Sequence, residues 1–377
     1  MIETKYAKII AKIATIDPVK YGKTRNFLWG NVSQLSPYVS RGVISTKQIV
    51  DSLVHRGFKP FQIERLLQQL SWRDYFQRTA QQFPDLSERN VKNDPLHFKS
   101  TGIPNAILNA EIGIDALDEG IEQLLETGWI HNHMRMYLSM LHTNVARCDW
   151  RSGARWMYYH LLDADMASND LSWQWVCGAN SNKLYVANQE NINKYVGSKQ
   201  GKTFLDVDYD AFSDMPISEP LRNTQDLSLT PTAVSIESLR KTTTILSPGE
   251  VFPNAKNSVL LYSWNNLDPK WREDESHRRI LLLDADEFER RPISARTLEF
   301  VLALSKNIYE LEIVYGRFDA LQAQLPEHTF IFKEHPTQIG WKGQEDSRDW
   351  IFPEVSEYTP SFFGYWKKCE KYLKQYL

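Results

Sequence analysis

The sequence has few cysteines and no long apolar run. Its 377 residues include only three cysteines, Cys148, Cys177 and Cys369, whose wide spacing rules out a disulfide framework and argues against a four-thiolate metal or iron–sulfur site. No segment approaches the roughly 18–20 apolar residues of a membrane helix. The first 18 residues are amphipathic and lack both arginine and an apolar core. We therefore expect no signal or transit peptide, and a cytoplasmic protein without membrane contact.

The sequence also lacks a G-x-G-x-x-G motif, a P-loop and a strong net charge. The formal net charge is −3, from 44 Lys and Arg against 47 Asp and Glu. The charge is uneven, because residues 1–200 carry 23 basic and 19 acidic side chains, a net of +4. The remainder carries 21 basic and 28 acidic side chains, a net of −7. A mildly basic first half permits a local nucleic-acid-binding groove without requiring one.

The apolar pattern predicts a multi-domain chain of α and α/β parts. Residues 1–196 are predicted to be helical, and 197–257 to be a linker or cover segment, because they mix Gly, Ser, Pro and Thr with little periodicity. Residues 258–377 are predicted to form a small α/β (Rossmann-like) module with a largely parallel sheet and a terminal helix. Its expected strands and one helix are SVLLYSW, RILLLDAD, LEIVYG, TFIFKE and PISARTLEFVLALSKN.

The stretch from Leu161 to Asn180, LLDADMASNDLSWQWVCGAN, combines three acids, an amide and two tryptophans. On a helix Asn169 and Trp173 share a face, whereas Trp175 points elsewhere. An amide and a carboxylate beside an indole suit a planar, redox-active ring with polar edges. A tryptophan-rich core helix with solvated acids is the alternative.

Three further segments carry candidate site residues. Asn31–Ser36 precedes a helix start at Ser36-Pro37, where backbone N–H groups can bind phosphate; a plain capped helix is the alternative. Residues 61–83 are predicted to be helical, with Gln69, Trp72 and Arg73 on one face, an arrangement that suits a flat base near a phosphate. A buried tryptophan beside a surface arginine is the alternative there.

The block TGWIHNHMRM, residues 127–136, contains a His-x-His pair. His131 and His133 diverge on a helix, and no further ligand spacing appears, so no metal site is predicted.

Four blocks in order resemble the photolyase/cryptochrome family: residues 31–45, 70–76, 127–136 and the D-x-D-x-A-x-N-x-x-x-W-Q-W pattern that begins at Asp163. The resemblance implies an all-helical FAD-binding domain over residues 1–196, here followed by the α/β module. Photolyases normally have the reverse order, so the chain looks like a short photolyase-like subgroup with rearranged topology. That subgroup is associated with repair in single-stranded DNA. An antenna chromophore is not predicted.

The resemblance implies noncovalent FAD, reduced in the active state. The cofactor-binding residues carried over are Tyr21, Val32, Ser33, Gln34, Leu35, Ser36, Arg73, Arg135, Asp163, Asp165 and Asn169. In the family the arginine matching Arg135 pairs with the aspartate matching Asp163. Asn169 is expected near flavin N5. The sequence departs from the family where Val32-Ser33-Gln34-Leu35-Ser36 replaces T-S-R-L-S.

The resemblance also implies a pocket for a damaged pyrimidine pair. The lesion-binding residues carried over are Arg25, Gln69, Trp72, Asn132, His133, Met136 and Trp175. Gln69 stands where the family usually has a glutamate, and His133 where it often has an arginine. Trp72 and Trp175 are expected to wedge or stack the flipped bases.

Electron supply to the flavin is expected through Trp173 and then Trp150. The family's third tryptophan falls at Ile107, which cannot be oxidised, so a shortened or rerouted path is predicted. It continues to Trp156 or to a tyrosine such as Tyr158 or Tyr159. The alternative is that Trp150 and Trp156 are only core aromatics.

The expected function is therefore light-driven, FAD-dependent splitting of cyclobutane pyrimidine dimers by a deoxyribodipyrimidine photo-lyase. The expected partner is dimer-bearing DNA, preferably single-stranded, and the expected oligomeric state is a monomer. A cryptochrome-like blue-light photoreceptor without repair activity is the alternative. A third reading is a helical nucleic-acid-binding protein without flavin.

Overall fold

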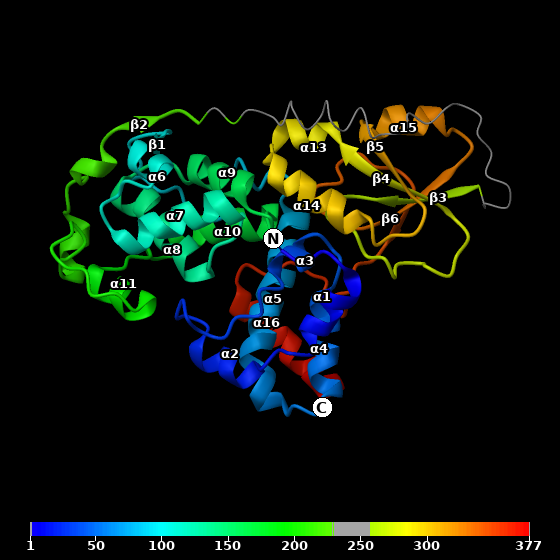
Figure 1. Ribbon diagram of the computed structural model, residues 1–377, viewed down its shortest axis with the longest axis horizontal. Helices are drawn as coiled ribbons and strands as arrows, with labels where there is room; N and C mark the ends of the chain where they lie inside the picture. The colour runs from blue at the N-terminus through cyan, green and yellow to red at the C-terminus, as the bar shows by residue number, and fades with distance from the viewer. Residues whose placement is uncertain (1, 228, 230–256, 377) are drawn as a thin grey trace. The chain divides into compact units, whose positions relative to one another are not determined.

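The computed structural model describes residues 2–227, 229 and 257–376 (Figure 1). Their contacts divide the chain into two compact units. The first unit contains residues 2–16, 33–84 and 257–376, and the second contains residues 17–32, 85–227 and 229. Among the helices of the described ranges, none combines the length and the apolar character needed to cross a bilayer.

The second unit is mainly helical. Its α-helices are α2 (Pro18–Thr24), α6 (Asn105–Asn109), α7 (Asp115–Thr127), α8 (Asn132–Met140), α9 (Trp150–His160), α10 (Met166–Val176) and α11 (Gln189–Val196). A π-helical turn, η1 (Leu141–Val145), continues α8. Such turns inside helices are frequent at functional sites.

The region predicted to be a linker or cover packs in part on the second unit. Strand β2 (Thr224–Gln225) pairs antiparallel with β1 (Ile103–Pro104), and the 3₁₀ turns η2 (Tyr209–Ser213) and η3 (Glu219–Leu221) precede it. Leu205 is completely buried. Residues 230–256 of the predicted linker lie outside the described residues.

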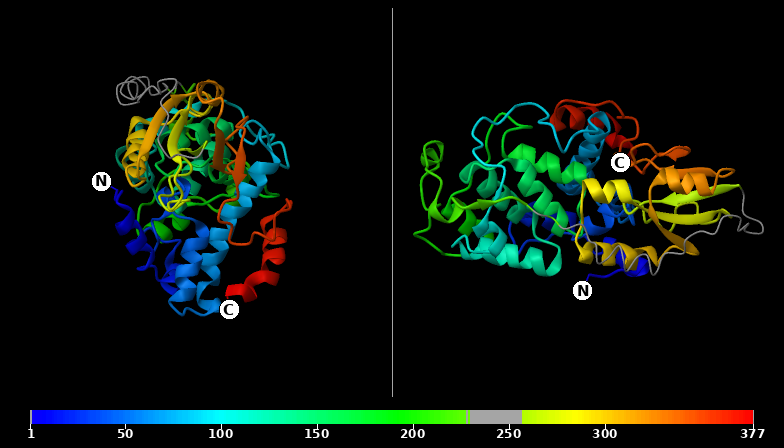
Figure 2. Two further views of the ribbon diagram at one scale, coloured as in Figure 1. Left: turned by 90° about the vertical axis from the view of Figure 1, so that its right-hand side faces the viewer. Right: turned by 90° about the horizontal axis from the view of Figure 1, so that it is seen from above.

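The first unit combines helices with a parallel sheet. Its helices are α1 (Tyr6–Ile13), α3 (Ser36–Ser40), α4 (Thr46–His55), α5 (Pro60–Gln82), α13 (Ala285–Arg290), α14 (Ala295–Ser305), α15 (Phe318–Gln324), α16 (Phe362–Cys369) and the 3₁₀ helix η4 (Glu370–Tyr376). Its strands are β3 (Ser258–Tyr262), β4 (Arg278–Asp284), β5 (Leu311–Gly316), β6 (Thr329–Lys333) and β7 (Gln344–Asp346). The five strands are parallel and lie in the order β5-β4-β3-β6-β7, so the predicted α/β module with a parallel sheet is confirmed. Figure 2 gives two further views of the ribbon.

Both faces of this sheet are covered, which explains its short, continuously apolar strands. Val259 and Leu261 of β3 pack with side chains of β4, β6 and α15 in one hydrophobic cluster. Leu260 and Tyr262 alternate with them and are also completely buried. The runs that form the central strands β3 and β4 are therefore buried on both sides, whereas LEIVYG forms the edge strand β5 and is only half-buried.

Strands β4 and β5 are added on one side of β3, and β6 and β7 on the other, so the strand order reverses between β3 and β6. Doubly wound sheets commonly bind ligands at such a point, at the carboxyl ends of the strands. In this chain residues 39–46 pack against that position. The Leu267 N–H donates to the Arg41 carbonyl at 2.9 Å, and the Arg41 guanidinium lies 4.0 Å from the Trp264 ring centre. Gly42 has a φ of 60°, and a Cβ there would lie 2.4 Å from the Asn265 carbonyl oxygen. The cavity left beside it has a volume of about 50 Å³, far below the several hundred Å³ of a typical small-molecule pocket.

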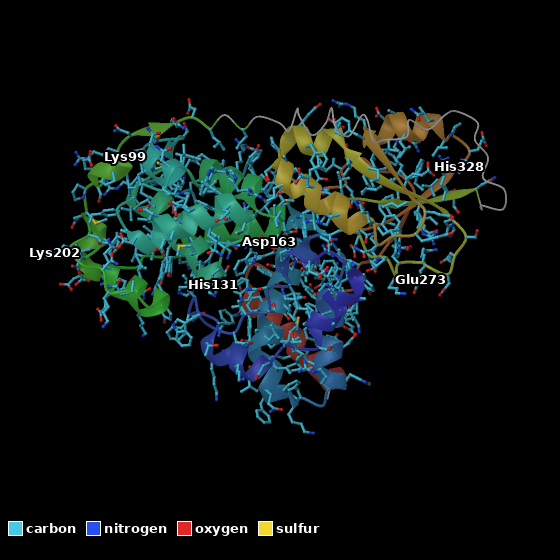
Figure 3. All side chains as sticks on the ribbon, viewed as in Figure 1. Lys99, His131, Asp163, Lys202, Glu273 and His328 are labelled. Atoms are coloured by element: carbon cyan, nitrogen blue, oxygen red, sulfur yellow. The ribbon has the colours of Figure 1, made fainter. Side chains whose placement is uncertain are left out.

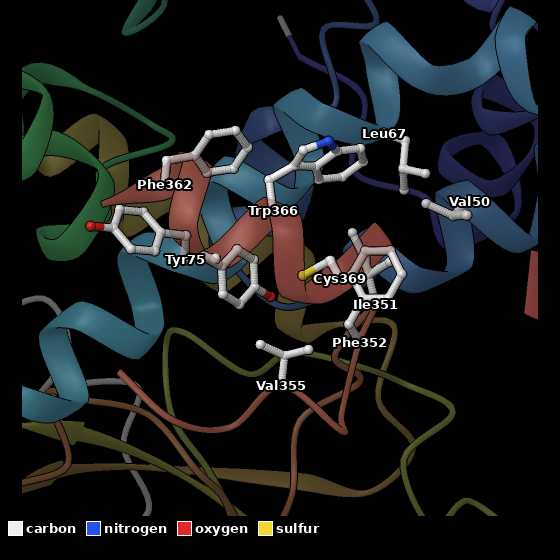
Figure 4. Close-up of a cluster of buried hydrophobic side chains, with 10 residues drawn as sticks. Val50, Leu67, Tyr75, Ile351, Phe352, Val355, Phe362, Trp366 and Cys369 are labelled. Carbon is white, nitrogen blue, oxygen red and sulfur yellow. The ribbon is translucent and has the colours of Figure 1, made fainter. Parts of the chain in front are cut away.

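Helix α5 packs against the C-terminal segment rather than only against the N-terminal helices. A buried cluster joins Val50, Leu67 and Tyr75 to Phe362 and Trp366 (Figure 4). Buried Asp74 accepts hydrogen bonds from Thr46 Oγ1 and the Ile351 N–H, each at 2.9 Å. The compact units do not follow the boundaries at residues 196 and 257, and the predicted division into 1–196, 197–257 and 258–377 stays a prediction.

Candidate flavin and electron-transfer site

The predicted pairing of Arg135 with Asp163 is present in the second unit. Arg135 Nη2 donates to Asp163 Oδ2 at 2.9 Å, and its Nε and Nη2 both donate to the Ile130 carbonyl at 3.1 Å. The Asp163 side chain, labelled in Figure 3, is only 2% exposed. A buried ion pair that is also hydrogen-bonded to backbone has a fixed orientation, because breaking it would leave an uncompensated charge. The guanidinium plane is therefore held in place before any ligand binds.

Asp165 caps a helix, whereas Asp163 pairs with Arg135. It is the N-cap of α10, and its Oδ1 accepts the Ser168 N–H at 2.7 Å. A carboxylate at this position satisfies a free helix amide and interacts favourably with the positive end of the helix dipole. The LDAD sequence thus directs one acid to Arg135 and the next to the start of α10. A direct contact of Asp165 with a cofactor stays a prediction.

Asn169 lies half-buried one turn into α10. Its Nδ2 donates to the Ala154 carbonyl at 3.0 Å and to Asp170 Oδ1 at 2.9 Å. Both partners are acceptors, which fixes the amide nitrogen on their side and leaves the Asn169 Oδ1 as the end available to a ligand. The side chain is consequently prepared to accept a hydrogen bond from a donor such as a ring N–H.

Trp173 lies at the contact between α9 and α10. It is 2% exposed, and an added Cβ on Gly153 would lie 2.4 Å from its ring. His142, in the π-helical turn, meets the same indole edge-on, with ring centres 5.5 Å apart. Glycine at position 153 therefore allows the close approach of the two helices at the indole. No pattern in the sequence indicated a role for either Gly153 or His142.

Trp150 is on the same side of α9 as Gly153, three residues earlier. It is 1% exposed, and its Nε1 donates to Asn90 Oδ1 at 2.9 Å. Farther along α9, Trp156 is buried and Tyr159 is half-buried, and both contact the His160 ring. Helix α9 thus carries a series of oxidisable side chains from the Trp173 contact to its C-terminal end, including Tyr158, which is buried. Ile107, at the position of the family's third tryptophan, lies on α6 and is also buried.

His131 and His133 are both buried, whereas Asn132 between them is exposed. The His133 N–H donates to His131 Nδ1 at 3.1 Å, which places His131 as the cap of α8. Burial lowers the pKa of both rings, that of His133 to about 4 with smaller contributions from His131 and Arg25. His133 is thus neutral near pH 7. Within the described ranges no group of acidic, histidine or cysteine side chains has the arrangement of a metal site.

The remaining predicted residues of the second unit are distributed over several elements. Tyr21 lies on α2, where burial raises its pKa to about 12. Arg25 follows α2, and its Nη1 donates to the Gly22 carbonyl at 3.1 Å. Trp175 is 39% exposed and contacts Tyr185, so it does point away from buried Trp173. The others are Val32, half-buried, and Met136, whose Sδ lies 3.7 Å from Asn132 Nδ2.

The structure of the predicted phosphate-binding segment, Asn31–Ser36, differs from the prediction in one detail. Ser36 is the first residue of α3 rather than its cap; the cap position is Leu35, and no side chain caps the helix. Gln34 has a φ of 51° and Leu35 follows in right-handed helical backbone. A left-handed residue followed by a right-handed one turns successive N–H groups inward, which is the geometry of a backbone anion nest. Ser33 Oγ accepts the Leu35 N–H at 3.4 Å.

The predicted face of α5 belongs to the first unit, as do residues 33–36. Arg73 Nη2 donates to Ser40 Oγ at 2.7 Å, and Gln69 is exposed. The Trp72 ring stacks on Phe362, with ring centres 3.9 Å apart and planes 11° apart. Phe362 was not foreseen, because it lies nearly three hundred residues later in the chain. One face of Trp72 is thus covered by protein, and its role as a base wedge stays a prediction that concerns its other face.

Comparison with known proteins identifies one region. Residues 66–204 match the family described as the FAD binding domain of DNA photolyase. The chain is 29% identical over 155 residues to a deoxyribodipyrimidine photo-lyase of Alkalihalophilus pseudofirmus, covering 40% of this chain and 32% of the relative. It is 32% identical over 157 residues to one of Streptomyces griseus, covering 39% and 32%. The chain thus spans about a third of the length of these relatives.

Solved structures with a similar arrangement include a bacterial class III photolyase from Agrobacterium tumefaciens, at a TM-score of 0.45 and 21% identity, covering 63% of this chain and 56% of that one. A cryptochrome from Synechocystis matches at a TM-score of 0.47 and 20% identity, covering 52% and 44%. The sequence comparisons show that residues 66–204 of this chain are similar to the FAD binding domain of DNA photolyase.

Proposed function

We propose that this protein is a light-driven DNA repair enzyme that splits cyclobutane pyrimidine dimers, preferably in single-stranded DNA. The observation that carries the proposal is the fixed set formed by the Arg135–Asp163 ion pair and the oriented Asn169 amide, within the region that matches the flavin domain. The order of this region before the α/β module favours the rearranged, short photolyase-like subgroup.

The residues present fit a flavin. The Gln34–Leu35 backbone supplies N–H groups for a pyrophosphate, together with Ser33, Ser36 and Arg73. Arg135, held by Ile130 and Asp163, presents a cation to the polar edge of the ring. The remaining proposed cofactor contacts are Tyr21, Val32 and Asp165.

When bound, reduced FAD would supply, on excitation by blue light, the electron that opens the two carbon–carbon bonds joining the pyrimidines, and the electron would return to the flavin after they separate. Because Ala154 and Asp170 hold the Asn169 Nδ2, the Asn169 Oδ1 would accept a hydrogen bond from the ring position that carries a proton only in the reduced states. An amide suits this position because it tolerates several oxidation states without itself gaining or losing a proton. Asp163 holds the Arg135 guanidinium in place, so that it would stabilise negative charge on the ring.

Trp173 and Trp150 are proposed to carry electrons toward oxidised flavin. Both are buried, Trp173 at the α9–α10 contact that Gly153 makes close and Trp150 three residues before Gly153 on α9. Burial protects an oxidised indole from side reactions, and Trp156 or a tyrosine on α9 continues the path. The path prepares the enzyme for repair and takes no part in dimer splitting.

The proposed lesion contacts of the second unit are Arg25, Asn132, His133, Met136 and Trp175. Lesion contacts of Gln69 and Trp72 stay predictions from the family resemblance. Neutral His133 and the amide of Asn132 offer hydrogen bonds to a pyrimidine edge without placing a charge there.

Two observations favour the alternative, a cryptochrome-like photoreceptor. Phe362 covers one face of Trp72, and Gln69 replaces the usual acid of the lesion pocket. A photoreceptor would keep the flavin and the Trp173–Trp150 path while losing lesion binding.

The test combines two measurements on the purified protein: light-driven reduction of its oxidised flavin, and dimer splitting after the flavin has been reduced chemically. Oligonucleotides that contain one thymine dimer, single- or double-stranded, are incubated in blue light and in the dark. The proposal expects light-dependent loss of dimers, faster on the single strand. Light-driven flavin reduction without any dimer splitting would instead establish the photoreceptor alternative.

A further inference from the structure

A rigid turn in the second unit holds an indole out of the protein surface. Trp29 is 66% exposed, although the loop that carries it is tightly hydrogen-bonded. The Gly30 N–H donates to the Phe27 carbonyl at 2.8 Å, and the Asn31 N–H donates to Thr24 Oγ1 at 2.9 Å. An added Cβ at Gly30 would lie 1.9 Å from the Thr24 carbonyl oxygen, so this tight turn requires glycine.

Other aromatic rings support the exposed indole from below. Phe27 stacks on Trp29 with ring centres 4.7 Å apart and planes 28° apart, and it contacts Tyr195 at 5.2 Å. The Leu28 N–H donates to the Tyr195 carbonyl at 2.9 Å, which fastens the turn to the end of α11. Trp29 is therefore a preorganised flat surface rather than a mobile side chain.

The same series of rings reaches the proposed lesion-binding helix. Tyr195 contacts the His133 ring on α8, with centres 4.7 Å apart, and His133 contacts Tyr137 at 5.2 Å. The rings thus run from His133 through Tyr195 and Phe27 to Trp29. A strand whose damaged bases lie at His133 would place a neighbouring nucleotide near the Trp29 end of this series.

The charge of the two segments matches a phosphate backbone. Residues 17–32 and 189–199 together carry five basic side chains, Lys20, Lys23, Arg25, Lys194 and Lys199, against the acids Asp17 and Glu190, a net of +3. Lys194 Nζ lies 5.4 Å from the centre of the Tyr195 ring. Aromatic side chains beside cations are the recurrent means of binding single strands, because every base offers a flat face.

We propose that Trp29, supported by Phe27 and Tyr195, is a stacking platform for an unpaired base of single-stranded DNA next to the lesion, and that Lys194 and Arg25 contact the adjoining phosphates. This proposal rests on the proposed function in naming DNA as the ligand. It deepens that function by explaining a single-strand preference, since a base paired within a duplex cannot offer its face to Trp29.

The first test measures binding of an undamaged oligothymidine of about 12 nucleotides, a length within the usual site size, by fluorescence anisotropy over a range of salt concentrations. Trp29→Ala is expected to weaken binding about tenfold, as the loss of one stacked base predicts, without changing the salt dependence. Trp29→Phe retains most of the affinity. Lys194→Ala lowers the slope of log K against log salt by about 0.7, the contribution of one phosphate contact on a single strand.

Tyr309→Ala is the matched control, because Tyr309 is 74% exposed in the α/β part of the chain beside Glu310. It is expected to bind like the wild type. Wild-type affinity in Trp29→Ala, or an equal loss in Tyr309→Ala, would overturn the proposal. An oligouridine bound as tightly as the oligothymidine would overturn the assignment to DNA.

A second measurement separates this proposal from the proposed function. Under light, Trp29→Ala is expected to split a dimer within an isolated dinucleotide as fast as the wild type, but to lose the advantage of the longer strand. If the wild type splits no dimer while Trp29→Ala still loses strand affinity, the platform stands and the repair function fails. Equal benefit from the longer strand in both proteins would contradict the platform.

Discussion

The rings of Trp72 in α5 and Phe362 in α16 lie face to face, with centres 3.9 Å apart, and so join two helices that are far apart in the sequence. Phe362 is 3% exposed and also contacts the rings of Tyr75 and Trp366. An aromatic stack inside a buried cluster contributes both apolar burial and a ring–ring interaction. The contact therefore stabilises the first unit and limits access to Trp72 at the same time.

Replacing Phe362 with Ala is expected to lower the free energy of unfolding by about 3–5 kcal/mol, because it removes a fully buried ring. Phe363→Ala is the control, since its neighbouring ring is 74% exposed, and a change within about 0.5 kcal/mol is expected there. Urea unfolding followed by tryptophan fluorescence measures both. Equal stability of the two variants would show that the stack is not formed.

The close approach of Gly153 to Trp173 predicts a variant that disturbs electron supply. Gly153→Ala places a methyl group 2.4 Å from the indole, so the ring must move; a cost of about 1–3 kcal/mol in stability is expected, together with slower light-driven reduction of oxidised flavin. Gly316→Ala is the control, because nothing lies within 4 Å of the added Cβ. Flavin absorbance during illumination reports the rate. Photoreduction at the wild-type rate in Gly153→Ala would contradict the role of this contact.

Trp173→Phe separates photoreduction from repair. The variant is expected to lose light-driven reduction of oxidised flavin, because phenylalanine is far harder to oxidise than tryptophan. The same protein, reduced chemically beforehand, is expected to split dimers like the wild type. If light reduces the flavin of Trp173→Phe at the wild-type rate, the assignment of Trp173 is wrong. If the reduction is lost in Trp173→Phe but normal in Trp150→Phe, the path runs by a route that does not include Trp150.

The ion pair of Arg135 and Asp163 predicts that Asp163→Asn strongly lowers both stability and flavin retention. Asp163→Asn leaves the guanidinium without its charge partner, so a loss of about 3–5 kcal/mol in stability and weaker flavin retention are expected. Glu88→Gln is the control, because the Glu88–Arg155 pair is more than half exposed on both sides, and exposed pairs contribute at most about 1 kcal/mol. Thermal unfolding and flavin release measure the two effects. Similar results for the two variants would argue against a preorganised pair.

The burial of the His142 ring predicts that the folded protein becomes less stable at acid pH. Burial lowers its pKa to about 4, so the folded protein keeps the ring neutral where the unfolded chain takes up a proton. Unfolding then binds protons, and stability falls as the pH drops from about 6.5 toward 4, by on the order of 3 kcal/mol for this residue. His142→Gln, which keeps a donor for the Asp149 carbonyl, is expected to flatten this decline. Urea midpoints at several pH values check it, and an unchanged decline in the variant would refute the assignment.

The sequence predicted the parts of the structure whose signals are local. Apolar runs of branched residues located β3 to β6, and helical spacing located α5. The Arg135–Asp163 pair followed from the family resemblance. The contact of Trp72 with Phe362 and the packing of Gly42 on Asn265 did not, because no local pattern records which distant segment covers a side chain. The π-helical turn that presents His142 has no recognised sequence signal either.

Flavin content tests the central claim most directly. The account predicts that the purified protein is yellow and that heat denaturation releases equimolar, unmodified FAD, since no cysteine or histidine is expected to attach it covalently. Asp163→Asn is expected to retain less of it. A colourless protein that binds no FAD even after unfolding and refolding with the cofactor would contradict the account as a whole.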